Sequence, residues 1–254
     1  MKDKIKVAIF DLTDCEGCEL QFLAFREKLL DLEKSIEITN WRLAKAKNDN
    51  GPFDVAFIEG SPLTLDDIEM IKEIRQSAGA IVALGDCASL AGIPGIVNPR
   101  EREALARKVY GKNYELAVKR VYPLSHYITI DYHIRGCPVT EPELEYVVSS
   151  LIWGKVLSPK PFPVCLQCKA KENHCLLLEG KACLGPITKG GCGALCPSVS
   201  HRCYGCYGPA KGANIEPFKK HLSEVVGRDE ASRQLHFFIT NPSMEEENKE
   251  KKKA

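Results

Sequence analysis

The chain has 254 residues, enough for one large domain or two modest ones, and 44% of them are hydrophobic, which excludes a disordered protein. No run of about 18 apolar residues occurs, so the sequence predicts no membrane-spanning helix. The net charge is +1, and the lysines of the more basic C-terminal part are scattered, which argues against a nucleic-acid partner. The N-terminal residues lack the basic and apolar regions of a secretion signal, so we expect a cytoplasmic protein.

The first part of the chain alternates predicted strands with predicted helices. Apolar runs predict strands over residues 5–10, 36–41, 54–59, 80–84 and 128–130. Helical patterns cover residues 19–32, 65–77 and 141–153. This alternation is typical of βαβ units and a parallel sheet. We therefore expect residues 1–157 to form a flavodoxin-like, doubly wound α/β domain.

The character of the chain changes at residue 158. The segment 158–163 holds three prolines and reads as a linker. Residues 165–206 show no clear helical or strand period and are rich in Gly, Pro and Cys. Such a segment buries too little apolar surface to fold alone, and bound metal would supply the missing cross-links. We expect residues 158–254 to form a small irregular cluster domain, with a weak helix at 217–226 and a disordered C-terminal tail.

Twelve cysteines divide into three sets of four. In a cytoplasmic protein, thiols stay reduced, so a dense cysteine pattern indicates metal or redox chemistry rather than disulfides. Four thiolates are the number that holds one [4Fe–4S] cluster. The count therefore predicts three clusters, on the cysteines Cys15, Cys18, Cys87, Cys137, Cys165, Cys168, Cys175, Cys183, Cys192, Cys196, Cys203 and Cys206.

The first four cysteines follow predicted strands. Cys15 and Cys18 come after the first strand, Cys87 after the strand at 80–84, and Cys137 after the one at 128–130. Because ligands of open parallel sheets bind at the carboxyl ends of the strands, we expect these thiols to meet. A thioredoxin-like dithiol is the alternative for Cys15 and Cys18, but it leaves Cys87 and Cys137 without a role.

The loop after the first strand has no G-x-G-x-x-G or other glycine-rich phosphate-binding pattern. CEGC occupies the place where such folds bind a nucleotide or flavin. We therefore expect no nucleotide or flavin in this chain.

The eight later cysteines have a competing interpretation. The CxxC pairs at 165–168 and 203–206 are also typical of tetrahedral zinc. Two structural zinc ions, in an interaction module without electron transfer, would use all eight. The upstream set favours iron–sulfur clusters, because its ligands are built into a sheet.

The ordered set of motifs resembles a known family. CEGC, IEGS, GDC, GCP, CLQC, CLGPITKGGCGALCP and CYGC, spread over residues 5–208, are similar to those of the small subunit of cytosolic [NiFe]-hydrogenases. Within that family the chain is most similar to sulfhydrogenase delta subunits and to the small subunits of methyl-viologen-reducing hydrogenases.

The resemblance implies an electron-transfer subunit. A separate large subunit would hold the Ni–Fe centre that splits H₂. This chain would pass electrons between that centre and a flavoprotein or ferredoxin-type partner. The proximal cluster would be held by Cys15, Cys18, Cys87 and Cys137. By order along the chain, Cys165, Cys168, Cys175 and Cys183 match the distal cluster, and Cys192, Cys196, Cys203 and Cys206 match the medial one.

Two departures from the periplasmic relatives bear on the clusters. Those relatives use a histidine as the first distal ligand, where this chain has Cys165. Their medial cluster has three irons and three cysteines, whereas Cys196 here offers a fourth thiol. The chain is thus expected to hold a four-iron medial cluster of lower potential, which suits an acceptor such as NADP⁺ or ferredoxin.

Glu59, at the end of the third predicted strand, is a candidate for assisting proton movement at the contact with the large subunit. The alternative is a carboxylate satisfied by local hydrogen bonds. A second family reading is a quinone-oxidoreductase-like iron–sulfur subunit of the same fold. It fits less well, because that subunit has adjacent cysteines in its first motif and lacks the eight-cysteine domain.

Overall fold

A computed structural model describes residues 4–25, 31–98, 102–155, 157 and 160–239. These residues divide into two compact units after Leu157. The tail expected over the last ten residues lies outside the described part of the chain.

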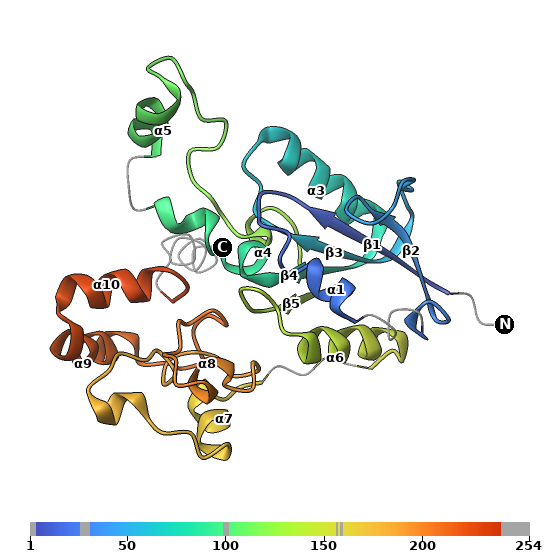
Figure 1. Cartoon of the computed structure of the whole chain (residues 1–254). Helices are drawn as coiled ribbons and strands as arrows, with labels where there is room; N and C mark the ends of the chain where they lie inside the picture. The colour runs from blue at the N-terminus through green and yellow to red at the C-terminus, as the bar shows by residue number, and fades with distance from the viewer. Residues whose placement is uncertain (1–3, 26–30, 99–101, 156, 158–159, 240–254) are drawn as a thin grey trace. The chain divides into compact units, whose positions relative to one another are not determined.

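The first unit is built on a five-stranded parallel sheet (Figure 1). Its strands are β1 (Ile5–Asp11), β2 (Ile36–Trp41), β3 (Phe53–Glu59), β4 (Ala78–Leu84) and β5 (Tyr132–Ile134). They lie in the order β2-β1-β3-β4-β5, with every neighbouring pair parallel. This is the flavodoxin-like order, which changes direction between β1 and β3. The predicted fold class is confirmed.

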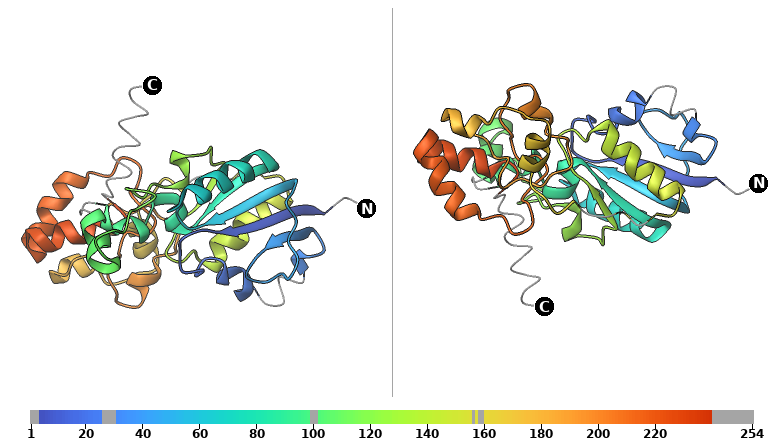
Figure 2. Two further views of the ribbon diagram at one scale, coloured as in Figure 1. Left: turned by 90° about the horizontal axis from the view of Figure 1, so that it is seen from above. Right: turned by 90° about the horizontal axis from the view of Figure 1, so that it is seen from below.

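Helices cover both faces of the sheet (Figures 1 and 2). On one face, α1 (Leu20–Ala24) and α6 (Glu141–Ile152) share a core with β1, β3 and β4, including Phe22 and Leu144. On the other face, α3 (Leu65–Ser77) buries Ile71 and Ile74. Because both faces are buried, the strands read as continuous apolar runs. Of the helix expected at 19–32, residues 26–30 lie outside the described residues.

The predicted fifth strand is wrong by a few residues. Residues 128–130 form no strand, and β5 begins at Tyr132. Ile128 and Ile130 instead pack in the core on the α3 side of the sheet. Asp131 starts the pairing with β4, because its N–H donates to the Ile81 carbonyl at 3.0 Å and its carboxylate accepts the Ile81 N–H at 2.7 Å.

A long connection joins β4 to β5. It contains α4 (Gly85–Leu90), the 3-10 turn η1 (Pro94–Val97), α5 (Arg102–Tyr110) and the 3-10 turn η2 (Leu124–His126). None of these helices was predicted, because each is short and α5 buries only one of its residues, Ala106.

The second unit is made of short helices and irregular turns. They are α7 (Val164–Ala170), the 3-10 turn η3 (Leu176–Glu179), α8 (Leu195–Ser198), α9 (Ile215–Val226) and α10 (Arg228–His236). The helix predicted at 217–226 is confirmed as α9. One small core gathers residues such as Leu184, Leu222 and Leu235. A second core surrounds cysteines, with Val164, Leu176 and Ala194 against Cys183 and Cys203.

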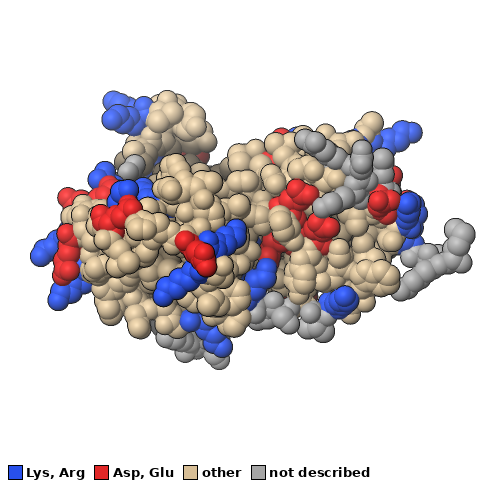
Figure 3. All heavy atoms as spheres, turned by 60° about the horizontal axis from the view of Figure 1, so that its bottom comes forward, with Lys and Arg blue, Asp and Glu red and all other residues tan. Residues whose placement is uncertain are grey.

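Among the described residues, no helix has both the length and the apolar character needed to cross a membrane. Charged side chains of both signs are interspersed over the face drawn in Figure 3.

Candidate metal centres

The first four predicted ligands meet at the carboxyl edge of the sheet. Cys15 and Cys18 lie in the loop after β1, Cys87 in α4 directly after β4, and Cys137 after β5. Their thiols are close enough to affect one another. Besides burial, Cys87 raises the pKa of Cys18, Cys137 raises that of Cys87, and Cys15 raises that of Cys137. The loops of three strands therefore bring the set together, as a ligand site at this edge requires.

Close backbone approach shapes this site. Gly85 has φ +78°, and a Cβ there would lie far inside contact distance of the Cys18 Sγ. A Cβ on Gly17 would lie 3.2 Å from the Cys15 Sγ. Glycine at position 85 thus leaves room for the Cys18 thiol.

Asp86 clamps the loops that carry Cys87 and Cys137. Its backbone N–H donates to the Gly136 carbonyl at 3.0 Å, and its side chain accepts the Gly136 N–H at 3.2 Å. The Cys87 carbonyl accepts the Ser61 hydroxyl at 2.7 Å. Asp86 and Ser61 were not predicted as site residues, although they belong to the motifs GDC and IEGS.

Glu59 ends β3, between the two strands whose loops carry Cys18 and Cys87. Only 1% of its surface is exposed. Its Oε1 accepts the N–H of Cys18 at 3.0 Å and its Oε2 accepts the N–H of Glu19 at 2.7 Å. Burial raises the pKa of Glu59 and these backbone donors oppose the rise. The carboxyl group thus anchors the CEGC loop through both of its oxygens.

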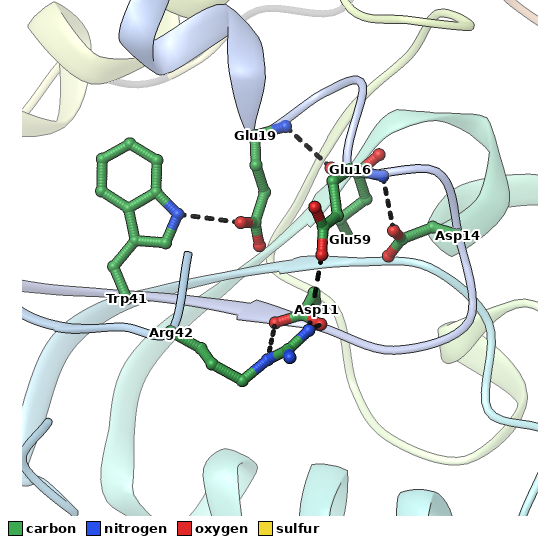
Figure 4. A network of polar contacts seen from close by, with 7 residues as sticks. All are labelled: Asp11, Asp14, Glu16, Glu19, Trp41, Arg42 and Glu59. Carbon is green, nitrogen blue, oxygen red and sulfur yellow. Dashed lines mark hydrogen bonds and ion pairs between the residues drawn. The ribbon is translucent and has the colours of Figure 1, made fainter. Parts of the chain in front are cut away.

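A network of acidic side chains extends from Glu59 (Figure 4). Glu19 is fully buried, and its Oε2 accepts the Trp41 indole N–H at 2.8 Å. Burial raises the pKa of Glu19 to about 7. Asp14 accepts the Glu16 N–H at 2.7 Å, while Arg42 forms an ion pair with Asp11. A glutamate beside CEGC could have been noticed in the sequence, but its pairing with a tryptophan 22 positions away could not.

The chemistry of the first set suits a metal cluster. Burial raises the pKa of the Cys18 thiol, that of Cys87 to about 12 and that of Cys137 to about 11. Without metal, the neutral thiols would crowd together in a partly buried site. Metal binding deprotonates such thiols and compensates the thiolate charges, so the donor set fits a thiolate-ligated cluster.

Four of the later cysteines gather around α7. Cys165 and Cys168 lie on that helix, Cys175 precedes η3, and Cys183 follows it. The pKa of Cys165 is raised to about 11. Burial is the largest cause, and the nearby thiols of Cys183, Cys168 and Cys175 add to it. A Cβ on Gly185 would lie 3.1 Å from the Cys165 Sγ and 3.6 Å from the Cys183 Sγ.

Three cysteines of the remaining set, Cys192, Cys196 and Cys203, lie near Cys183. Burial raises the pKa of Cys196 and of Cys203, and the nearby thiols of Cys192 and Cys183 raise both further. The N–H of Cys203 donates to the Cys183 Sγ over 3.3 Å. Cys183 therefore lies close to cysteines of both expected sets.

No group of three or more His, Cys, Asp or Glu side chains in the described residues could hold a single metal ion. His174, which lies next to Cys175, pairs instead with Glu179 at 2.8 Å.

Comparison with known proteins decides the family. Residues 15–151 match the family model described as NADH ubiquinone oxidoreductase, 20 Kd subunit. Over 92% of this chain and 99% of the relative, the sequence is 37% identical to the sulfhydrogenase 2 subunit delta of Pyrococcus furiosus. The chain belongs to the family of this model, and within it to the hydrogenase small subunits.

Two further comparisons agree with this membership. One protein of the F420-non-reducing hydrogenase of Methanocaldococcus jannaschii is 32% identical over 80% of this chain and 82% of the relative. A chain of an NAD+-reducing [NiFe]-hydrogenase, solved in the H2-reduced state, is similar in structure. It has a TM-score of 0.57 and 26% identity, covering 63% of this chain and 97% of that one.

Proposed function

We propose that this hydrogenase small subunit passes electrons, through three [4Fe–4S] clusters, between the Ni–Fe site of a large subunit and a soluble acceptor. The observation that carries the proposal is the meeting of Cys15, Cys18, Cys87 and Cys137 at one edge of the sheet. The later cysteines, several of which lie close to Cys183, support a continuation of the relay. When bound, each cluster would supply a centre that accepts and releases one electron at a time.

The residues of this chain would hold and orient the clusters. Cys15, Cys18, Cys87 and Cys137 are the proposed ligands of the proximal cluster. The proposed distal ligands are Cys165, Cys168, Cys175 and Cys183, and the proposed medial ligands are Cys192, Cys196, Cys203 and Cys206. Glu59 and Asp86 fix the loops that carry the proximal ligands.

The relatives support the proposed partners. In the proposal this chain has no H₂-splitting centre of its own. A hydrogenase large subunit would supply that centre and would contact the proximal site. The acceptor would be a flavoprotein or iron–sulfur subunit that leads to NAD(P), or a ferredoxin, in a cytoplasmic complex. The name of the NAD+-reducing relative supports the first of these.

Iron and acid-labile sulfide analysis of the anaerobically purified chain tests the proposal. Three clusters predict about twelve irons and about twelve sulfides per chain, at about four of each per cluster. Zinc in place of iron would favour the interaction-module alternative. Iron confined to the first four cysteines would favour the quinone-oxidoreductase-like alternative.

The proposed role of Glu59 in proton movement has its own test. Both carboxyl oxygens accept backbone N–H groups, which favours the anchoring role. Glu59→Gln keeps one acceptor oxygen but places an amide donor against the other N–H. Slower H₂ turnover with unchanged iron content and an unchanged proximal EPR spectrum would support proton transfer. An altered proximal spectrum would support anchoring alone.

A further inference from the structure

The connection between α4 and β5 is closed at its base by one side chain. The Asn98 amide donates to the Val121 carbonyl at 2.8 Å, and its oxygen accepts the Val121 N–H at 3.0 Å. Asn98 and Val121 are both buried. These two hydrogen bonds therefore hold residues 98 and 121 together at one point of the first unit.

The residues beyond this clasp, Arg102–Arg120, are called the arm. Its two ends are joined by the Arg102 guanidinium, which donates to the Val118 carbonyl at 2.9 Å. Lys119 and Glu103 form an ion pair at 3.6 Å. These internal contacts, with buried Ala106 and Val118, hold the arm in shape. Figure 1 draws α5 beyond the end of the sheet, against neither of its faces.

The arm exposes large apolar side chains. Val109 and Tyr110 are 72% and 68% exposed. Leu105, one helical turn before Val109, is 38% exposed, and Tyr114 is 43% exposed. The rings of Tyr110 and Tyr114 lie 4.7 Å apart. Exposed apolar groups that gather on one element, with aromatic rings among them, are typical of a protein interface.

The charge of the arm indicates which kind of protein surface could bind it. Residues 102–120 hold six basic side chains and two acidic ones, and Arg107, Lys108 and Lys112 are exposed. A second copy of the arm would bring like charges together. The part of this chain from residue 160 onward is also basic, with fifteen Lys and Arg against ten Asp and Glu. An acidic surface on another protein is the complementary choice.

The place of the arm in the chain identifies the partner. The two 3-10 turns that flank the arm, η1 and η2, both contact α4, which carries Cys87. The base of the arm therefore lies near the sheet edge where the proximal ligands meet. We propose that the arm inserts its apolar side chains into an apolar groove with an acidic rim on the hydrogenase large subunit. The inference rests on the proposed function, which brings that subunit to this edge.

Carbodiimide cross-linking of the purified complex of both subunits tests the arm directly, because the reagent joins a lysine amine to a neighbouring carboxylate. We expect links from Lys108 and Lys112 to the large subunit, and slower amide hydrogen exchange over residues 102–114 in the complex than in the chain alone. Links only to residues 160–239 or to a second copy of this chain, or unchanged exchange in the complex, would overturn the proposal.

A variant and its control measure the contribution of the arm. Lys108→Glu combined with Val109→Asp should weaken subunit association by roughly tenfold or more, since both groups are exposed and the change leaves the buried contacts alone. Lys211→Glu combined with Lys220→Glu, at exposed positions of the second unit, should leave association unchanged. Equal association of both variants and the wild type would overturn the proposed role of the arm and leave the proposed function standing. Failure of the wild-type chain to pair with a large subunit would overturn the proposed function as well.

Discussion

The two units place their cysteines in different ways. In the first, two apolar cores, around Phe57 and Ile81, flank the sheet, and Cys18 is the one proximal ligand that joins one of them; the other three lie at the edge of the sheet. In the second, Cys183 and Cys203 are themselves members of a small core. We therefore expect the first unit to keep its fold without metal, and the cysteine-lined core of the second unit to depend on the proposed clusters.

Iron removal should separate the two units most strongly. After anaerobic chelation, we expect residues 164–208 to lose protection from amide hydrogen exchange, while β1, β3 and β4 keep theirs. The reason is that the first unit retains its apolar cores, but the second loses its cross-links. Equal loss in both units, or in neither, would contradict the contrast.

Gly85→Ala should damage the first site alone. The new Cβ meets the Cys18 Sγ, and φ +78° at this position strains any side chain. We expect the loss of about four of the twelve proposed irons, with the later clusters unchanged by EPR. Gly111→Ala is the matched control, because its φ of +103° brings the same kind of strain with nothing within 4 Å of the new Cβ. Equal iron loss in both variants would point to backbone strain rather than crowding at Cys18.

Cys196→Pro should change one cluster of the second unit without removing it. Loss of the proposed fourth medial thiolate is expected to leave a three-iron cluster on Cys192, Cys203 and Cys206. The measurement is the EPR spectrum of the oxidised chain, in which a three-iron signal should appear. An unchanged spectrum would show that Cys196 is not a cluster ligand.

Asp131→Asn should have the smallest effect, confined to the first unit. Burial raises the pKa of Asp131, but the Ile81 N–H and Arg75 lower it by more, so it lies below its usual value. The ionised form therefore stabilises the unit above the unfolded pKa of about 3.9, and this stability is lost as the pH falls through the folded pKa. The Asp131 side chain is 46% exposed, so screening limits the loss in the variant to about 0.2–1 kcal/mol at pH 7.

Urea unfolding of the iron-depleted first unit measures this difference at pH 7 and again at lower pH. The gap between wild type and Asp131→Asn should narrow as the pH falls toward the folded pKa. A gap that does not depend on pH would mean that the hydrogen-bond geometry matters and the charge does not.

The sequence predicted most of the sheet because both faces of the strands are buried and each strand reads as an apolar run. It misplaced β5, because the apolar residues Ile128 and Ile130 serve the core before the strand begins. It did not predict α7 or α8, because these short helices lie among glycines and prolines and carry cysteines in place of an apolar stripe.

The candidate site divides in the same manner. Strand ends and cysteine spacing predicted that Cys15, Cys18, Cys87 and Cys137 would meet, and the structure places their thiols as neighbours. The contacts that fix the loops, such as Asp86 with Gly136 and Glu19 with Trp41, join residues 50 and 22 positions apart. Such pairs depend on the register of loops against strands, which no local pattern contains.

The most direct test of the account is iron anomalous diffraction from crystals of the anaerobically purified hydrogenase complex. We expect three separate iron clusters in this chain, each bound by one of the three cysteine sets, with the first at the carboxyl edge of the sheet. Single metal ions in the second unit, or four free thiols at the edge of the sheet, would contradict it.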